Sequence, residues 1–427
     1  MKILILNQDW FADEFRALGH EVCTCGTAEH LNVVLPTPCL HIETIIKEHL
    51  DGFRPDLILW LDNSAPLFTI GLDDTDILTV FYSVDTHHHS YIHRFLAHIF
   101  DLSFIAQKDY LKEFEAVGSE AFWLPLWASR HVEASESKTH GAVFVGNLNA
   151  KLNPDRVAFF EALKKEVPIL ATTGEYWKIF PFSEIVVNQT VKGDLNFRVF
   201  ETMMCGALLL TEYAPNGLFE IFKEGVHLVT YEKNNVQSAA QKIRELLADL
   251  PKTRKIAQAG REEVIAHHLP KHRAEFLLKS FSGLKKKNSN RKHFANAFSF
   301  SILARNIESM DINTAARSLV TAMSSLEEGL KKNEKMHEDI GIESIFACIR
   351  YDQIFSSTAG MTMIFRLADA YPDYAGFTLA KIRQLLNQGL IGEAKSLSEE
   401  NFSESPEKIF SEAEKFVSSI LASSNAI

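Results

Sequence analysis

The sequence predicts an α/β protein with two tandem, doubly wound parallel-sheet units followed by an all-helical region. Short apolar runs alternate with segments of helical spacing, and this alternation restarts after a polar stretch at 129–140. The runs are apolar on both faces, which is typical of parallel strands covered by helices on each side. No strand pattern is found beyond 294. These observations predict domains at 1–130, 140–282 and 294–427.

In the first unit, apolar runs predict the strands and helical spacing predicts the helices between them. Pro55 ends one helical segment, and Gly19 and Gly118 follow two others. The predicted strands are 2–6, 21–24, 56–61, 77–84, 102–106 and 121–124, and the predicted helices are 11–19, 40–50, 90–100 and 110–117.

The second unit repeats the pattern. Gly206 is placed to end a helix in the left-handed conformation, and the polar 129–140 segment is interpreted as the linker before it. The predicted strands are 142–145, 169–172, 185–188, 207–211 and 227–231, and the predicted helices are 154–167, 195–205, 217–223, 236–250 and 251–268.

The last third carries a weaker pattern. Residues 379–397 resemble a single tetratricopeptide hairpin, whereas an array needs several repeats at a fixed period, so a plain helical bundle is the alternative. The basic stretch before it, Lys285 to Lys292, is interpreted as a solvated linker. Contact with anionic lipid is the second interpretation of this charge run.

Composition excludes several classes of protein. The 427 residues carry 44 Lys and Arg against 55 Asp and Glu, a net charge of −11, which disfavours a general nucleic-acid binder. Five scattered cysteines suggest no disulfide framework and favour a reducing compartment. The first apolar run is too short for a signal peptide, and no run approaches a membrane span. We therefore expect a cytoplasmic protein.

Several familiar catalytic motifs are absent from the sequence. It contains no GxxxxGK[ST], no GxGxxG after the first strand, no HExxH and no GxSxG. The α/β pattern is therefore not that of a P-loop or dinucleotide enzyme.

The segment 193–211, GDLNFRVFETMMCGALLLT, is the most informative. Asp194 or Asn196 is placed to cap a helix whose N-terminus suits phosphate. Arg198 and Glu201, three residues apart, share one face of that helix. A guanidinium binds phosphate and a carboxylate accepts hydrogen bonds from a diol, as a nucleotide would require. An ordinary ion pair on a helix surface is the alternative.

This segment resembles the donor half of GT-B glycosyltransferases, in the branch of CgeB-type proteins, related to the glycosyl transferase family 1 type. The resemblance is carried by the pattern N-x-R-x-F-E-x-x-x-x-G, which Asn196, Arg198, Phe200, Glu201 and Gly206 match. It implies two Rossmann-like domains over about 1–280. Weaker similarity lies at 143–146 with Arg156, and at 104–108 and 123–126.

The resemblance implies a nucleotide-sugar donor, with UDP favoured, and no cofactor or metal. Glu201 would bind the ribose, Arg198 the diphosphate region, and Asn196 would lie beside them. The retaining branch has a further Glu eight residues before the second, where this chain has Gly193, with Asp194 shifted by one. The stereochemical outcome therefore stays open.

Other strand ends face the expected cleft. Gly146, Asn147 and Gly174 would approach the donor phosphate or sugar, or else they are turns. In the first unit, the run 83–90 (SVDTHHHS) follows a strand, so Asp85 and His88 are our candidates for the base that deprotonates the acceptor.

Two other interpretations of the histidine run stay open. One is loop polarity with a helix cap. The other is a metal site in which His89, His93 and Asp85 supply ligands. Asp74-Thr75-Asp76 matches the DxD signature of the other large glycosyltransferase fold, but it precedes its strand and is interpreted as an acidic turn.

The expected function is sugar transfer, of a metal-independent hexosyltransferase type. The acceptor would be a protein such as flagellin or a surface glycan, recognised by the first domain and the C-terminal helices. These helices would otherwise mediate oligomerisation. The alternatives are a non-catalytic glycosyltransferase-like scaffold and a metal-dependent hydrolase built on His87 to His89.

Overall fold

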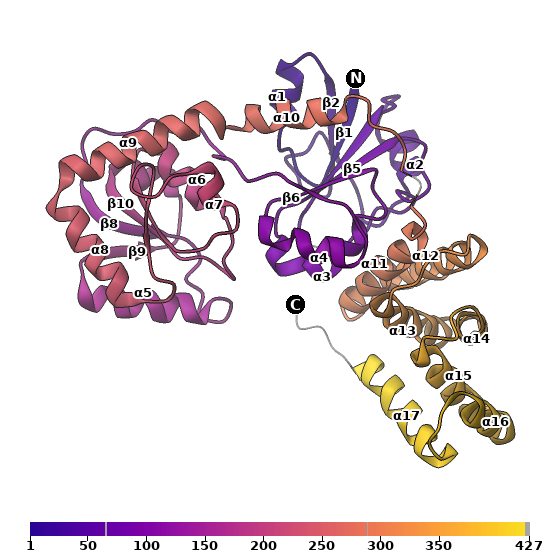
Figure 1. Ribbon diagram of the computed structural model, residues 1–427. Coiled ribbons are helices and arrows are strands. Elements are labelled where there is room, and N and C mark those ends of the chain that lie inside the picture. The colour runs from indigo at the N-terminus through magenta and orange to yellow at the C-terminus, as the bar shows by residue number, and fades with distance from the viewer. Residues whose placement is uncertain (65, 288, 423–427) are drawn as a thin grey trace.

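The computed structural model describes residues 1–64, 66–287 and 289–422. It contains two parallel sheets and a helical region, which confirms the predicted fold class (Figure 1). The first sheet has the order β3-β2-β1-β4-β5-β6-β7, and every neighbouring pair is parallel. Its strands are β1 (Lys2–Leu6), β2 (Glu21–Gly26), β3 (Val33–Val34), β4 (Leu57–Leu61), β5 (Leu78–Ser83), β6 (Leu102–Ile105) and β7 (Phe122–Trp123). The edge strand β3 was not predicted, because two residues carry no periodicity.

The helices of the first half follow the predicted order. The segment predicted at 40–50 is a short α-helix that continues as a π-helix, labelled η1. The elements are α1 (Ala12–Ala17), α2 (Ile42–Thr44), η1 (Ile45–His49), α3 (Thr86–Leu96), the 3₁₀ turn η2 (Lys108–Tyr110) and α4 (Leu111–Ala116).

The second sheet has the order β12-β11-β10-β8-β9 and is also parallel throughout. Its strands are β8 (His140–Val145), β9 (Ile169–Thr172), β10 (Ser183–Asn188), β11 (Leu208–Glu212) and β12 (Val229–Tyr231). Its helical elements are α5 (Pro154–Glu166), η3 (Tyr176–Lys178), η4 (Phe180–Phe182), α6 (Phe197–Met204), α7 (Leu218–Ile221), α8 (Val236–Ala248) and α9 (Leu250–His267).

Helix α6 begins later than predicted, and its start corrects the capping hypothesis. Asn196 occupies the N-cap position, but no side chain caps the helix. Asp194 instead accepts hydrogen bonds from the Val191 N–H, at 2.6 Å, and from the Asn196 amide, at 3.3 Å. The helix end is as predicted: Gly206 has φ +68°, the left-handed conformation that glycine adopts without strain.

Helix α10 (Pro270–Phe281) returns from the second half to the first, where it lies beside α1 (Figure 1). Ala274, Leu277 and Phe281 join the buried cluster that contains Phe15 of α1. The Arg273 Nε donates to the Pro125 carbonyl at 2.7 Å. The chain thus crosses between the halves twice, which fixes them across the cleft.

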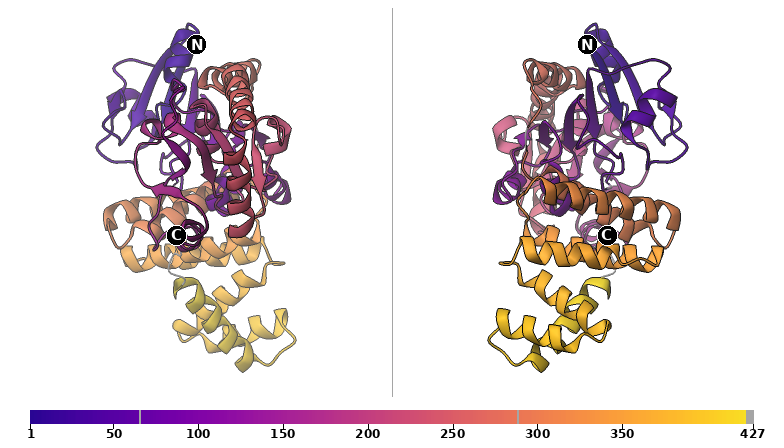
Figure 2. Two further views of the ribbon diagram at one scale, coloured as in Figure 1. Left: turned by 90° about the vertical axis from the view of Figure 1, so that its left-hand side faces the viewer. Right: turned by 90° about the vertical axis from the view of Figure 1, so that its right-hand side faces the viewer.

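The helical region follows in antiparallel hairpins that extend away from the first sheet (Figures 1 and 2). Its first helix shares a core with that sheet, because Phe294 and Phe298 belong to the cluster of Trp60 and Phe95. The tetratricopeptide character of the hairpin α15–α16 stays a prediction. The helices are α11 (Lys292–Ile307), α12 (Ile312–Lys331), α13 (Glu338–Phe355), α14 (Ala359–Ala370), α15 (Ala375–Asn387), α16 (Ile391–Asn401) and α17 (Pro406–Ala422).

Part of the basic segment faces the protein. The Lys286 Nζ donates to Asp101 Oδ2 at 2.9 Å and to the Ile77 carbonyl at 3.0 Å. The Lys292 Nζ donates to the Asp73 carbonyl at 2.6 Å. These contacts attach the helical region to the first half, and lipid contact by the segment stays a prediction. Among the described residues, no helix is both long and apolar enough to cross a bilayer.

Candidate active site

A pocket of about 470 Å³ lies between the two α/β halves, at the carboxyl ends of their strands. The structure brings all eight predicted site residues to this pocket. Two come from the turn after β5 and the first turn of α3, three from the turns after β8 and β9, and three from the start of α6. They are Asp85, His88, Gly146, Asn147, Gly174, Asn196, Arg198 and Glu201. Their roles stay predictions.

Arg198 lies at the floor of the pocket and is held in place on several sides. Its Nε donates to the Val145 carbonyl at 3.0 Å, and its Nη1 donates to Asn188 Oδ1 at 2.7 Å. The guanidinium stacks 4.6 Å from the centre of the Phe144 ring. A Cβ on Gly146 would overlap the remaining nitrogen, Nη2, so glycine leaves the space that this nitrogen occupies.

A second guanidinium, that of Arg156 in the first turn of α5, lies on the same aromatic ring, 5.7 Å from its centre. It donates to the backbone and side-chain oxygens of Gln189 at 3.3 and 3.4 Å. Burial, followed by the proximity of Arg156, lowers the pKa of Arg198 to about 10. Two neighbouring buried cations repel each other, and an anion bound between them would relieve that repulsion.

Glu201 lies one turn further along α6. Its Oε1 accepts a hydrogen bond from Ser129 Oγ at 2.7 Å, and Ser129 is also 3.0 Å from the Tyr176 hydroxyl. Burial raises the pKa of Glu201, and the Ser129 hydrogen bond and Arg198 counteract that rise. Ser129, in the linker between the halves, thus orients this carboxylate, and Tyr176 is its second hydrogen-bond partner.

The start of α6 is left open on the pocket side. Asn196 Oδ1 is buried and has no hydrogen-bond partner among the described residues. No side chain caps the helix, and in its first turn the Val199 N–H donates to the Asn196 carbonyl at 3.2 Å. A helix N-terminus of this kind favours a negatively charged group.

Asp85 is held by a network that the sequence did not reveal. Its carboxylate accepts a hydrogen bond from Ser64 Oγ, and it does not cap α3. Asp62, at the end of β4, accepts hydrogen bonds from the backbone N–H groups of Asp85 at 2.8 Å and Val84 at 3.0 Å. Burial raises the pKa of Asp62 to about 6. The helix-cap interpretation of Asp85 is therefore wrong.

Contacts across the cleft join the histidine run to the second half. His87 Nε2 lies 4.0 Å from Asp194 Oδ2, and Lys192 Nζ donates to the His87 carbonyl at 3.4 Å. Burial lowers the pKa of His87 to about 3 and raises that of Asp194 to about 6, so we treat His87 as neutral. The His88 side chain is more exposed than that of His87, and it lines the pocket.

The described side chains around the histidine run are not arranged as a metal site would require. Within 1–64, 66–287 and 289–422, no three His, Cys, Asp or Glu side chains are arranged to hold a metal ion. His93 is wholly buried, and its Nδ1 lies 2.8 Å from Ser83 Oγ. Asp74 and Asp76 lie in the turn before β5, as predicted for the DxD sequence.

Sequence reasoning missed several residues of the pocket. Asn153 and Arg156 lie at the start of the helix that follows β8; the resemblance to the family includes Arg156 but implies no role for it. Tyr176 and Ser129 lie in loops without a pattern, and only the fold brings them to Glu201. Asp62 could have been found as a carboxylate that directly follows an apolar strand.

Residues 139–279 match the family described as Glycosyl transferase-like. This range contains the donor-half residues of the pocket, and the predicted resemblance to glycosyltransferases is confirmed there, while the CgeB-type branch stays a prediction. No curated protein sequence matches the chain.

Solved structures similar to this chain share little sequence with it. Sucrose-phosphate synthase from Thermosynechococcus elongatus is 11% identical, with 66% of this chain and 99% of that chain covered and a TM-score of 0.48. HepE from Anabaena, in complex with UDP and glucose, is 12% identical, with 66% and 100% covered and a TM-score of 0.47. A glycosyltransferase from Rickettsia africae is 11% identical, with 67% and 99% covered and a TM-score of 0.47.

Proposed function

We propose that the chain transfers a sugar from a nucleoside-diphosphate sugar, UDP-linked, to a nucleophilic acceptor. The premise is the glycosyl transferase-like family match over 139–279, the range that supplies the donor half of the pocket. The observation that carries the proposal is the placement of Arg198, Arg156 and Glu201 around one pocket, with two guanidiniums at the floor and a carboxylate one helical turn away.

The proposed donor pose follows from charge and hydrogen-bonding capacity. The diphosphate would lie against Arg198, Arg156 and the open start of α6, where cations and N–H groups stabilise negative charge. Glu201 would accept hydrogen bonds from the ribose hydroxyls beside those from Ser129 and Tyr176. Asn147 and Gly174, on the turns after β8 and β9, would lie near the sugar or the phosphates.

In the proposed reaction, an acceptor hydroxyl attacks the anomeric carbon. The new bond forms from oxygen to carbon, and the bond from that carbon to the diphosphate oxygen breaks. The nucleoside diphosphate leaves with the bonding electron pair, and the guanidiniums stabilise its charge. Asp85, or His88 beside it, would accept the acceptor proton. The structure leaves both on the first-half side of the pocket, opposite the donor residues.

The acceptor belongs to the proposal as well. We infer that a protein or glycan acceptor would enter from the first half, with the helical region adding recognition surface. Closure around the donor would exclude water, so that the sugar passes to the acceptor and not to solvent.

The first test is calorimetric titration of the protein with UDP, GDP and dTDP in the presence of EDTA. We expect selective binding of one nucleotide, with affinity about tenfold to a hundredfold lower in Glu201→Ala, because a charged hydrogen-bond acceptor is lost. Glu161→Ala, at an exposed position on α5, is the matched control and should bind like the unchanged protein. Absence of binding by all three nucleotides would contradict the proposal.

A second assay separates an enzyme from a scaffold. The protein is incubated with the UDP-sugar whose nucleotide it binds, and release of free UDP is measured with and without candidate acceptors. We expect slow release alone and faster release with an acceptor. Tight nucleotide binding without any release would favour the non-catalytic scaffold.

A further inference from the structure

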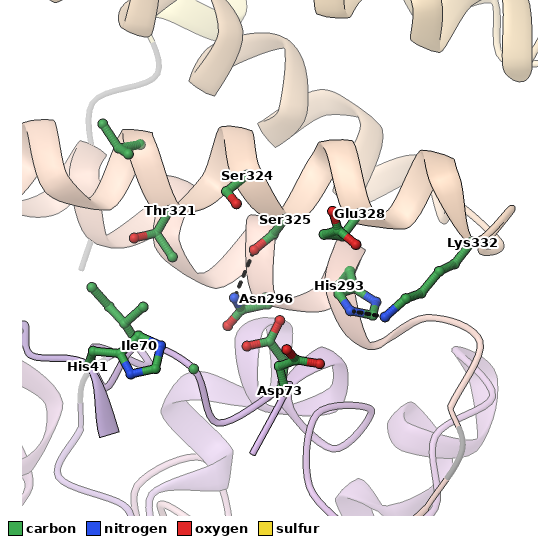
Figure 3. Close-up of a pocket in the computed structure, with 13 residues that line it drawn as sticks. His41, Ile70, Asp73, His293, Asn296, Thr321, Ser324, Ser325, Glu328 and Lys332 are labelled. Atoms are coloured by element: carbon green, nitrogen blue, oxygen red, sulfur yellow. Dashed lines mark hydrogen bonds between the residues drawn. The ribbon is translucent and has the colours of Figure 1, made fainter. Parts of the chain in front are cut away.

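A second cavity, of about 360 Å³, lies where the first half meets the helical region, apart from the pocket between the α/β halves. Its lower wall is the loop that carries Asp73 and Asp74, and its upper wall is formed by α11 and α12 (Figure 3). Both parts of the molecule are therefore needed to form it. None of its lining residues belongs to the proposed donor or acceptor site.

One buried polar atom in this cavity lacks a partner. Asn296, on α11, is 1% exposed, and its Nδ2 donates to Ser325 Oγ at 2.9 Å. Its Oδ1 has no hydrogen-bond partner among the described residues. Figure 3 shows the amide facing the same space as the Asp73 side chain. A buried acceptor without a donor is costly, so the arrangement calls for a ligand that donates a hydrogen bond.

Negative charge gathers at the same place. The Asp73 carboxylate accepts a hydrogen bond from its own backbone, and neither it nor the Asp74 carboxylate forms an ion pair with any residue that the structure describes; Glu328 adds a third carboxylate. Burial raises the pKa of Asp73. Three ammonium groups lie nearby and each has a partner: Lys292 donates to the Asp73 carbonyl at 2.6 Å, Lys332 lies 3.0 Å from His293 Nε2, and Lys331 pairs with Glu328 at 2.9 Å. The cavity thus offers three carboxylates and the Asn296 oxygen against one ammonium group in its lining, that of Lys332.

The lower wall is held in a fixed conformation. The Ile42 N–H donates to the Ile70 carbonyl at 2.8 Å, and the Ile70 N–H donates to the Leu40 carbonyl at 3.0 Å. Gly71 has φ +82°, and a Cβ there would lie 2.6 Å from His41 Nε2. The backbone that leads to Asp73 is therefore held in place before a ligand arrives, which lowers the entropic cost of binding.

We propose that this cavity binds a small organic ammonium compound, whose N–H groups donate to Asn296 Oδ1 and to the Asp73 carboxylate. Thr321 and Ser324 offer hydroxyls along α12 to the polar remainder of the ligand. A bare metal ion fits less well, because no three metal-ligating side chains converge within the described ranges. An amino sugar and an aliphatic diamine share the required chemistry. Because both walls contribute, the bound ligand would tie the helical region to the first half.

The test is calorimetric titration of the full chain with glucosamine and with putrescine, beside their neutral counterparts glucose and 1,4-butanediol. We expect saturable binding of at least one ammonium compound and none of the neutral compounds. Binding of glucosamine would identify the ligand class as an amino sugar, and binding of putrescine would identify it as an aliphatic diamine. Absence of saturation with both ammonium compounds would overturn the proposal, as would equal binding of the neutral ones.

Two substitutions locate the site. Asn296→Leu removes the unpartnered oxygen and Asp73→Asn removes the charge, and each should weaken binding roughly tenfold or more. Asp76→Asn, an exposed carboxylate in the same turn, is the matched control and should leave affinity unchanged. Unchanged affinity in both test variants would overturn the assignment. The ligand should also raise the melting temperature of the unchanged protein, a readout that stays valid if one variant fails to fold.

Discussion

Individual side chains at the proposed donor site are held by neighbours from distant parts of the chain. Glu201 is oriented by Ser129 of the linker, and Arg198 by the Val145 carbonyl and Asn188. Asp85 is held through Asp62 and Ser64. Such partners restrict rotamers before a substrate arrives, which is the usual basis of a preorganised site. Substitutions at these residues should therefore separate binding from turnover.

Asp85→Asn tests the base. The amide keeps the shape of the carboxylate but does not accept the acceptor proton, so turnover should fall about a hundredfold or more while nucleotide affinity stays unchanged. The measurement is UDP release with acceptor, beside calorimetry. Asp76→Asn serves as the control, since Asp76 is exposed in the acidic turn. If Asp85→Asn retains full turnover, His88→Asn is the next variant and Asp85 is excluded as the base.

Gly146→Ala tests the close approach of Arg198. The added methyl would lie 2.8 Å from the Phe144 ring and would overlap the guanidinium. Displacing such a group costs about 1–3 kcal/mol, so nucleotide affinity should fall roughly tenfold. Gly392→Ala, where a Cβ meets nothing within 4 Å, is the control. Unchanged affinity in Gly146→Ala would show that Arg198 does not need this position.

At the scale of elements, strand ends and helix starts build the site. The turns after β5, β8 and β9 carry Asp85, Gly146 and Gly174, and α6 begins at the same edge of the second sheet. The sequence predicted these positions, because an apolar run followed by polar residues marks a strand end. It did not predict the open start of α6, since capping depends on the rotamers that Asp194 and Asn196 adopt.

The helical region depends on close approaches between helices. Gly360, near the start of α14, lies against α13, where an added Cβ would be 2.6 Å from the Cys348 carbonyl carbon and would overlap its oxygen. We expect Gly360→Ala to lower the free energy of unfolding by about 1–3 kcal/mol, because backbone has little room to move. Urea denaturation measures this change, with Gly392→Ala as the control. Equal midpoints for the two variants would contradict the close packing.

At the scale of the whole molecule, buried neutral histidines link stability to pH. Burial lowers the pKa of His87, His93 and His268 to about 3 and that of His98 to about 4. In the unfolded chain these histidines bind protons near pH 6.5, whereas in the folded chain they stay neutral. The free energy of unfolding therefore falls as pH decreases from 6.5 towards 4. Each histidine contributes about 1.4 kcal/mol per pH unit.

Buried carboxyl groups with raised pKa values act in the opposite direction, Asp62 and Asp194 among them. The pKa values of Asp62 and Asp194 are raised to about 6, so between pH 6 and 4 the folded chain binds their protons first. Among the residues that the structure describes, eight histidines have a lowered pKa and six carboxyls a raised one, and we expect a net loss of stability on acidification. Chemical denaturation between pH 7.5 and 5 measures it. His93→Asn should reduce the slope by about one proton, whereas the exposed His30→Asn should not. An identical slope in both variants would contradict the burial of His93.

The arrangement of the three parts was the least predictable feature. Helix α10 crosses back to the first half, and α11 joins the core of the first sheet through Phe294 and Phe298. The helical region is therefore built onto the first half and not attached by a free linker. The predicted boundaries at 130, 140 and 294 describe the order of elements along the chain. They do not separate the parts that pack together, because α10 and α11 both pack against the first half.

The sequence by itself determined the alternation of strands and helices, the left-handed end at Gly206 and the face that carries Arg198 and Glu201. These are local properties, since periodicity and glycine conformation act within a few residues. Only the tertiary structure decided that Arg156 joins Arg198 over Phe144, that Ser129 holds Glu201, and that Asn296 faces Asp73 across a cavity. Such pairs lie far apart in the sequence, and strand order and chain crossovers bring them together, which no local pattern encodes.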